Sequence, residues 1–304
     1  MRFRFSVRGL LALVLIIAAG MGWIVRQAHV QRDAVAAIEK AGEVRYACDA
    51  NMSSPGNTLP GWKEGIAEYI GIDFVDHVVS VRLKSHGTRA DLQQAVDRLG
   101  DLVQVRRMNL MGIAVKDDAL VQVERMSRLE SLLLQFTSIS DGGLAHMRNL
   151  TNIKTLLIAG GISDAGLVHL KELTKLSDLT LQRTQISDAG LAHLSGLASL
   201  SELSLSDNKL SDAGLVHLKG LTNLSRLDLR RTQVSDAGLV HLKGLGQLSR
   251  LNLSYTQVSD AGLVHLKGLT KLSRLDVDYS TRVTDEGIKT LKQALPGLTI
   301  NRSY

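Results

Sequence analysis

Histidine and aspartate recur at regular intervals along the second half of the chain, and both residue types can hold metal ions or carry protons. In a helix of about 100° per residue, His169 lies at the flank of the face formed by Leu167, Leu170 and Leu173. We expect outer helices of neighbouring units to be too far apart for their histidines to share one ion. The sequence therefore predicts packing or hydrogen bonding for the recurring histidines, rather than metal binding or pH sensing. The set is His146, His169, His193, His217, His241 and His265.

The recurring aspartates suggest a calcium site, but each unit offers only one carboxylate. Calcium takes about six to eight oxygen ligands, so one carboxylate per unit falls short. A serine or threonine precedes each aspartate, which is typical of a helix N-cap followed by an acid in the first turn. The recurring aspartates are Asp141, Asp164, Asp188, Asp212, Asp236, Asp260 and Asp285.

No motif for catalysis or cofactor binding stands out. The chain has no phosphate-binding loop, no H-E-x-x-H and no G-x-S-x-G. Its one cysteine, Cys48, excludes an intrachain disulfide and a cysteine-rich zinc site. The net charge of +6 is mild for 304 residues, so nucleic-acid binding is not indicated. We predict no catalytic residues, no cofactor and no metal.

The spacing of the aspartates indicates how the chain is built. Successive steps are 23, 24, 24, 24, 24 and 25 residues. A fixed period of this length is typical of a solenoid, in which each unit buries its apolar face only against its neighbours.

One unit, read residue by residue, predicts a short strand followed by a helix. Leu179 and Leu181 alternate with polar residues, as in a strand with one buried face. Ser187 is a natural N-cap, and Gly190 is expected to let the helix approach the strand closely. The helix has leucines on one face, at Leu191, Leu194 and Leu197.

These residues resemble the leucine-rich repeat family, with its consensus L-x-x-L-x-L-x-x-N/T, and especially the ribonuclease-inhibitor-like and F-box-associated repeats. The resemblance covers Leu129 to the end, and weaker copies begin at Val78 and Val105. It implies an α/β horseshoe with a parallel concave sheet, outer helices and, usually, protein binding. Pro296 to Ile300 resembles a final strand. The Asn/Thr column holds Thr137, Thr184, Asn208, Thr232, Thr256 and Ser280, and Gly161 breaks it.

The N-terminal segment predicts a membrane anchor. Gly9 to Val25 is an uncharged run of 17 residues, about 25 Å long as a helix. The alternative is a cleaved signal peptide, but no polar cleavage region follows the small residues at Ala18 to Gly20. More arginines before than after the span favour a cytoplasmic N-terminus, so the repeats are expected on the non-cytoplasmic side of a single-pass membrane protein.

We divide the chain into three parts. Residues 1–27 are the cytoplasmic tail and transmembrane anchor. Residues 28–77 are a juxtamembrane helix, a loop and an N-terminal cap, while residues 78–304 are the repeat domain, degenerate over 78–128 and clear over 129–304. The aromatic cluster of the middle part is interpreted as the cap of the solenoid, with a docking helix for a partner as the alternative. The cluster is Trp62, Ile66, Tyr69, Ile70 and Phe74.

The residues that differ between repeats flank the strand leucines and are expected to face inward. One predicted column is Asp178, Glu202, Arg226, Arg250 and Arg274, and the next is Thr180, Ser204, Asp228, Asn252 and Asp276. Arginine and tyrosine are enriched at binding hot spots. The alternative is that solvent-facing positions vary freely. We predict a protein- or peptide-binding surface, called here the concave patch, of Arg226, Asp228, Arg230, Arg231, Arg250, Tyr255, Arg274, Asp278 and Tyr279.

The sequence therefore favours a membrane-anchored protein-interaction module that is not an enzyme. Its partners would be an unidentified protein or peptide on the concave patch and the lipid bilayer at Gly9 to Val25. One alternative is an adaptor resembling the F-box components of ubiquitin ligases, although no F-box segment is recognisable. Another is an envelope or polysaccharide binder, or an enzyme that uses the concave face.

Overall fold

The computed structural model describes residues 26, 29–46, 78–83, 89–102, 104–280 and 282–303. The chain divides into two compact units, Met1–Val105 and Arg106–Tyr304. The predicted span at Gly9 to Val25 and the predicted aromatic cap from Trp62 to Phe74 lie outside the described residues. Within the described part of the chain, no helix combines the length and apolar character needed to cross a membrane.

The first unit combines a helix with an antiparallel strand pair. Residues 29–41 are helical and bury one face that includes Ala34 and Ile38. Strand β1 (Gly42–Tyr46) pairs antiparallel with β2 (Val78–Leu83). Helix α4 (Arg89–Arg98) and the 3-10 helix η2 (Leu99–Asp101) follow. The strand at Val78 was predicted, but as part of a degenerate parallel repeat, and its antiparallel partner β1 was not predicted.

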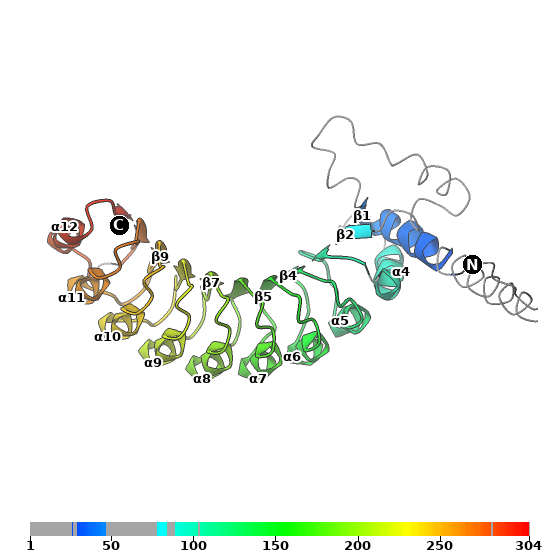
Figure 1. Ribbon diagram of the computed structural model, residues 1–304, viewed down its shortest axis with the longest axis horizontal. Coiled ribbons are helices and arrows are strands. Elements are labelled where there is room, and N and C mark those ends of the chain that lie inside the picture. The colour runs from blue at the N-terminus through cyan, green and yellow to red at the C-terminus, as the bar shows by residue number, and fades with distance from the viewer. Residues whose placement is uncertain are drawn as a thin grey trace, which may run out of the picture. The chain divides into compact units, whose positions relative to one another are not determined.

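The second unit is a parallel sheet whose strands lie in chain order (Figure 1). Each strand pairs with the next so that residues one period apart stand side by side, such as Leu227 and Leu251. β10 pairs with the last strand, β11, which overlaps the final strand predicted at Pro296 to Ile300. The strands are β3 (Arg107–Asn109), β4 (Ser131–Gln135), β5 (Thr155–Ala159), β6 (Asp178–Gln182), β7 (Glu202–Ser204), β8 (Arg226–Asp228), β9 (Arg250–Asn252), β10 (Arg274–Asp276) and β11 (Thr299–Asn301).

Helices cover the outer side of this curved sheet, and the strands line its inner side (Figure 1). The helices are α5 (Asp117–Val123), α6 (Asp141–Leu144), α7 (Asp164–Leu167), α8 (Asp188–Leu191), α9 (Asp212–Leu215), α10 (Asp236–Leu239), α11 (Asp260–Leu263) and α12 (Asp285–Ala294). Each helix from α6 to α11 continues into a 3-10 turn: η3 (Ala145–Met147), η4 (Val168–Leu170), η5 (Ala192–Leu194), η6 (Val216–Leu218), η7 (Val240–Leu242) and η8 (Val264–Leu266).

Leucine fills the core between the two layers. In β6, Leu179 and Leu181 are fully buried while the residues on either side of them are half-buried, which confirms the predicted alternation. The helical leucines Leu191, Leu194 and Leu197 are also fully buried. Each buried leucine contributes about 1.5–3 kcal/mol relative to an exposed one. Because the same positions are leucine in neighbouring repeats, the core continues from one repeat to the next.

The aspartate of each repeat bonds to the serine of the following repeat. Ser211 donates its backbone N–H to Asp188 Oδ1 at 2.8 Å and its hydroxyl to Asp188 Oδ2 at 2.5 Å. The same serine oxygen accepts the N–H of Ala213 at 3.3 Å, which confirms the predicted N-cap. We call this arrangement the Asp–Ser interlock. It joins Asp117 to Ser140, Asp141 to Ser163, Asp164 to Ser187, Asp188 to Ser211, Asp212 to Ser235, Asp236 to Ser259 and Asp260 to Thr284.

The glycine three residues after each capping serine or threonine makes room for the interlock. A Cβ placed on Gly190 would stand 2.2 Å from Oδ1 of Asp164, the aspartate of the preceding repeat. The expectation that Gly190 lets its helix approach the strand is therefore wrong, because the neighbouring carboxylate is what lies against it. The Ser-Asp-Ala-Gly phrase supplies both halves of one contact between repeats.

The recurring histidines lie in the 3-10 turns and are half-buried. His146 Nδ1 lies 3.2 Å from Glu124 Oε2, so the prediction of hydrogen bonding is confirmed for this residue. Across the described part of the chain, no three His, Cys, Asp or Glu residues are grouped so that they could hold a metal ion.

Candidate binding surface

The strand register aligns the predicted inward-facing columns. Arg226 stands beside Arg250, and Arg250 beside Arg274, along the parallel strands β8 to β10. Asp228, Asn252 and Asp276 form the next column in the same way. Strand spacing of about 4.8 Å places the backbone positions of the three arginines close together. Like charges this near repel unless they are compensated.

Two of the three arginines have an acidic partner. Arg226 Nη1 lies 2.9 Å from Glu202 Oε2, and Arg274 Nε lies 3.1 Å from Asp276 Oδ2. Among the described residues, no carboxylate lies within ion-pair distance of the exposed Arg250 side chain. Arg250 is therefore the cation of this column that remains available to a partner.

A shallow hollow of about 190 Å³ opens between these columns. Leu227 and Leu251 contribute to its lining, and the polar lining residues are Arg226, Asp228, Arg250, Asn252, Arg274 and Asp276. Burial raises the pKa of Asp228, and a hydrogen bond from the backbone N–H of Arg230 to this carboxylate, at 2.9 Å, opposes the rise. Asp276 thus compensates Arg274, whereas Asp228 bonds to the backbone of its own repeat.

Aromatic and cationic side chains stack where the strands end. The rings of Tyr255 and Tyr279 lie 4.5 Å apart between centroids at an angle of 21°. The Arg231 guanidinium carbon lies 4.7 Å from the Tyr255 centroid, and that of Arg230 lies 5.3 Å away. Such cation–π contacts contribute about 0.5–1 kcal/mol at exposed sites. Tyr255, Tyr279, Arg230 and Arg231 therefore form one cluster, called here the Tyr–Arg cluster.

The residues at this edge have left-handed backbone conformations, which the sequence analysis missed. The values of φ are 58° for Phe136, 51° for Arg183, 57° for Asp207, 52° for Arg231, 58° for Tyr255 and 54° for Tyr279. The equivalent positions of two other repeats hold Gly112 and Gly160, with φ of 71° and 80°. A left-handed conformation costs a residue with a Cβ about 1–2 kcal/mol. The glycines were the available signal, because glycine adopts this conformation without that cost.

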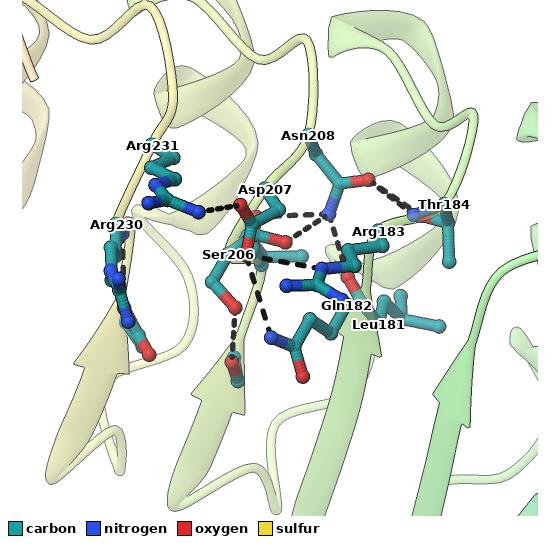
Figure 2. Close-up of polar contacts among 12 residues, drawn as sticks. Leu181, Gln182, Arg183, Thr184, Ser206, Asp207, Asn208, Arg230 and Arg231 are labelled. Carbon is teal, nitrogen blue, oxygen red and sulfur yellow. Dashed lines mark hydrogen bonds and ion pairs between the residues drawn. The ribbon is translucent and has the colours of Figure 1, made fainter. Parts of the chain in front are cut away.

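A buried asparagine holds this edge together in the middle of the sheet (Figure 2). Asn208 Nδ2 donates to the carbonyls of Leu181, Leu205 and Ser206 at 2.6, 2.9 and 3.2 Å. Its Oδ1 accepts from the backbone N–H and the hydroxyl of Thr184 at 2.9 and 2.7 Å. The predicted Asn/Thr column therefore has a structural role, as it ties the loop of one repeat to the next.

Asp207, next to this asparagine, bridges two arginines. Its carboxylate lies 3.8 Å from Arg183 and 3.4 Å from Arg231, and its side chain is 15% exposed. Figure 2 shows Asp207 between them, with Gln182 also approaching it. Arg231 is therefore compensated on one side and stacked on the other.

The nine predicted residues fall into three groups. Arg226, Asp228, Arg250 and Arg274 surround the hollow, as its lining shows. The Tyr–Arg cluster forms the second group. Asp278 is separate, because its carboxylate accepts the backbone N–H of Ser303 at 2.6 Å and so ties down the C-terminal segment.

Sequence reasoning missed an apolar area at the other end of the same sheet. Phe136 is 62% exposed and Met111 is 37% exposed. Leu133 and Leu157 stand side by side in a column that is polar in later repeats, and both are half-buried. Leucine at these two inward-facing positions was the sequence signal.

The comparisons with known proteins agree with this fold. Leucine rich repeat is the family that matches, over residues 174–234. Internalin C2 of Listeria monocytogenes is similar at 24% identity and a TM-score of 0.54, over 68% of this chain and 84% of that chain. No curated protein matches.

Two other solved structures are similar at lower scores. Internalin inlF of Listeria monocytogenes has 18% identity and a TM-score of 0.40, over 80% of this chain and 94% of its own. The Leptospira interrogans leucine-rich repeat protein LIC12759 has 18% identity and a TM-score of 0.48, over 67% and 56%. The repeat pattern, the family match and the fold shared with internalin C2 support a leucine-rich repeat protein.

Proposed function

We propose that this chain is a protein-interaction module, without catalysis of its own, that binds a protein partner on the concave patch. The leucine-rich repeat fold is generally a scaffold for protein interaction, which supports the coarse assignment. The observation that carries the finer proposal is Arg250, an exposed cation beside the hollow with no acidic partner among the described residues.

The composition of the concave patch supports the same assignment. Arginine and tyrosine are the residue types that dominate interface energetics. Tyr279 is 48% exposed, although its ring stacks on Tyr255. Both tyrosines keep a left-handed backbone conformation that glycine would adopt at lower cost. Large side chains at positions whose conformation costs the fold energy are consistent with a functional surface.

The proposal places the module at a membrane. Gly9 to Val25 is the proposed single-pass anchor, with the repeats on the non-cytoplasmic side. Protease added to intact cells should then degrade the repeats, and the residual anchor should stay in the membrane fraction. Repeats that resist protease until the membrane is opened would contradict this orientation.

Capture of a partner tests the binding surface. Proximity labelling with the full-length chain identifies candidates, and each is then tested for direct binding. Replacing Arg230, Arg231 and Tyr255 together by alanine should abolish binding and leave the melting temperature within a few degrees of the wild type.

A matched control changes three exposed residues on the outer side, Val216, Val240 and Val264, to alanine. This variant should bind like the wild type. Partners that bind the concave triple variant as tightly as the wild type would overturn the proposed function.

A further inference from the structure

The two ends of the concave sheet differ in chemistry, and the difference describes the partner. At β4 and β5 the inward column holds Leu133 and Leu157, whereas at β8 the same column holds Asp228. Phe136 follows β4 at the edge of the sheet and exposes 62% of its surface. An exposed aromatic three residues along the chain from the half-buried Leu133 adds apolar surface in contact with water, which is unfavourable without a partner.

Glycines occupy the positions equivalent to Phe136 in the two flanking repeats, and among the described residues the space beside each of them is empty. No atom lies within 4 Å of the place where a Cβ would stand on Gly112 or on Gly160, the equivalent residues of the flanking repeats. No ring or cation among the described residues contacts Phe136. In the Tyr–Arg cluster, by contrast, the Tyr255 ring stacks on Tyr279. The Phe136 ring therefore has no ring or cation of the described residues against it and is open to cover by another molecule.

The backbone of Phe136 supports a role outside the fold. Its φ of 58° is left-handed, and both flanking repeats have glycine at this position. A glycine at 136 would remove about 1–2 kcal/mol of strain, although it would loosen the unfolded chain by about 0.5–1 kcal/mol. The packing of the fold alone therefore gives no reason for a phenylalanine here.

Along the first inward column, the charge changes from negative to positive between the apolar end and the concave patch. Asp178 and Glu202 come next after the apolar end, and the three arginines follow. Burial, together with the charge of Glu202, raises the pKa of Asp178, which indicates an acidic segment of the sheet. Glu202 is paired with Arg226, but Asp178 has no ion pair among the described residues, so a partner's carboxylate is disfavoured beside Asp178 and favoured beside Arg250.

We propose that the partner is a single protein segment that covers Phe136 with apolar side chains at one end and pairs a carboxylate with Arg250 at the other. This inference rests on the proposed function and specifies its partner. Five strand spacings separate β4 from β9, about 24 Å along the sheet. Arg250 also stands five residues before Tyr255, which occupies the position equivalent to Phe136, so the diagonal from Phe136 to Arg250 is about 29 Å. A helix of about 19 residues or an extended segment of about nine residues covers that length. Because the apolar end and the concave patch lie on one continuous sheet, a single segment can contact both.

Selection from a random-peptide display library of about 20 residues per peptide, on the full-length chain in detergent, tests the partner chemistry. Enriched peptides should combine an apolar cluster with an acidic residue. Phe136→Gly and Arg250→Glu should each raise the dissociation constant of an enriched peptide about tenfold or more. Replacing the acidic residue of the peptide by lysine should restore binding to Arg250→Glu, because the charges are exchanged.

The possible results separate this inference from the proposed function. No enrichment on the wild type, or equal binding to the variant with alanine at Arg230, Arg231 and Tyr255, contradicts the proposed function. Enriched peptides that are basic, or that lose affinity with Arg250→Glu but not with Phe136→Gly, overturn the two-ended partner alone. Val240→Ser on the outer side is the matched control, and it should leave the dissociation constant unchanged.

Discussion

The outer side of the repeats and the inner face of the sheet differ in how their polar groups are used. On the outer side, Asp212 bonds to the backbone and hydroxyl of Ser235, and the same pair recurs along the second unit. On the inner face, each repeat has its own residues, and Arg250 has no acidic partner among the described residues. The outer Asp and Ser groups satisfy one another within the fold, whereas Arg250 on the inner face is available to another molecule.

This difference shows which residues of a repeat must fit the neighbouring repeats. An interlock between repeats must fit the repeat before it and the repeat after it, so its sequence hardly varies. A side chain on the inner face needs only to tolerate its neighbours. The comparison predicts that changes on the outer side lower stability, while changes on the inner face affect binding with little loss of stability.

Among changes at the contacts between repeats, the largest loss is expected from Gly238→Ala. The new Cβ would stand 2.4 Å from Asp212 Oδ1 and 3.0 Å from a methyl group of Leu215. Overpacking of this kind costs about 1–3 kcal/mol, which lowers the melting temperature by several degrees. Circular dichroism melting measures it. Gly244→Ala is the control, since no atom lies within 4 Å of its Cβ position, and it should be neutral or slightly stabilising.

A double-mutant cycle then tests whether the aspartate causes that loss. Asp212→Ala removes the acceptor of two hydrogen bonds from Ser235 and should cost about 1–3 kcal/mol. It also removes the carboxylate that Gly238→Ala would collide with. The double variant should therefore be more stable in urea unfolding than the sum of the two losses indicates. Strict additivity would contradict the interlock.

Asn208→Ala should cost about 2 kcal/mol, because a buried amide that donates to three carbonyls is lost. Thr232 occupies the same column in the next repeat and donates only to the carbonyl of Leu229, at 2.6 Å. Thr232→Ala should therefore cost less, about 1 kcal/mol. Equal unfolding free energies for the two variants would show that the loop does not depend on the asparagine network.

Phe136→Gly should leave the unfolding free energy unchanged or raise it by less than about 1 kcal/mol, since relief of left-handed strain slightly exceeds the added freedom of the unfolded chain. Leu134→Gly is the contrasting change, because Leu134 is fully buried two residues earlier. That variant should lose several kcal/mol. Destabilisation of Phe136→Gly by more than about 1 kcal/mol would mean that the ring serves the fold.

The smallest effect concerns pH. Burial raises the folded-state pKa of Asp228 above the ordinary 3.8. Its charged form therefore lowers stability above the folded-state pKa, and this penalty disappears as the pH falls below 3.8. Asp228→Asn should be slightly more stable than the wild type near neutral pH and equal to it in strong acid. Urea unfolding at both pH values measures the difference, and a larger gain in acid would contradict the assignment.

Much of the scaffold could be predicted from the sequence. The alternation around Leu179 predicted the strand, Ser187 predicted the helix start, and the 24-residue steps predicted which arginines align. The role of Gly190 was misread, because the carboxylate against it belongs to a residue 26 positions earlier in the chain. Phe136 was overlooked because its significance depends on the open positions beside it, which single repeats do not reveal.

The sequence by itself determined the period, the buried leucines and the alignment of columns, because these follow from local alternation and regular spacing. Only the tertiary structure decided which groups satisfy one another. Asp188 meets Ser211, and Arg226 meets Glu202, because parallel strand pairing brings residues about one period apart together. Among the described residues, the same pairing leaves Arg250 and Phe136 without such partners. Their availability is a property of neighbouring repeats in contact, which no single repeat contains.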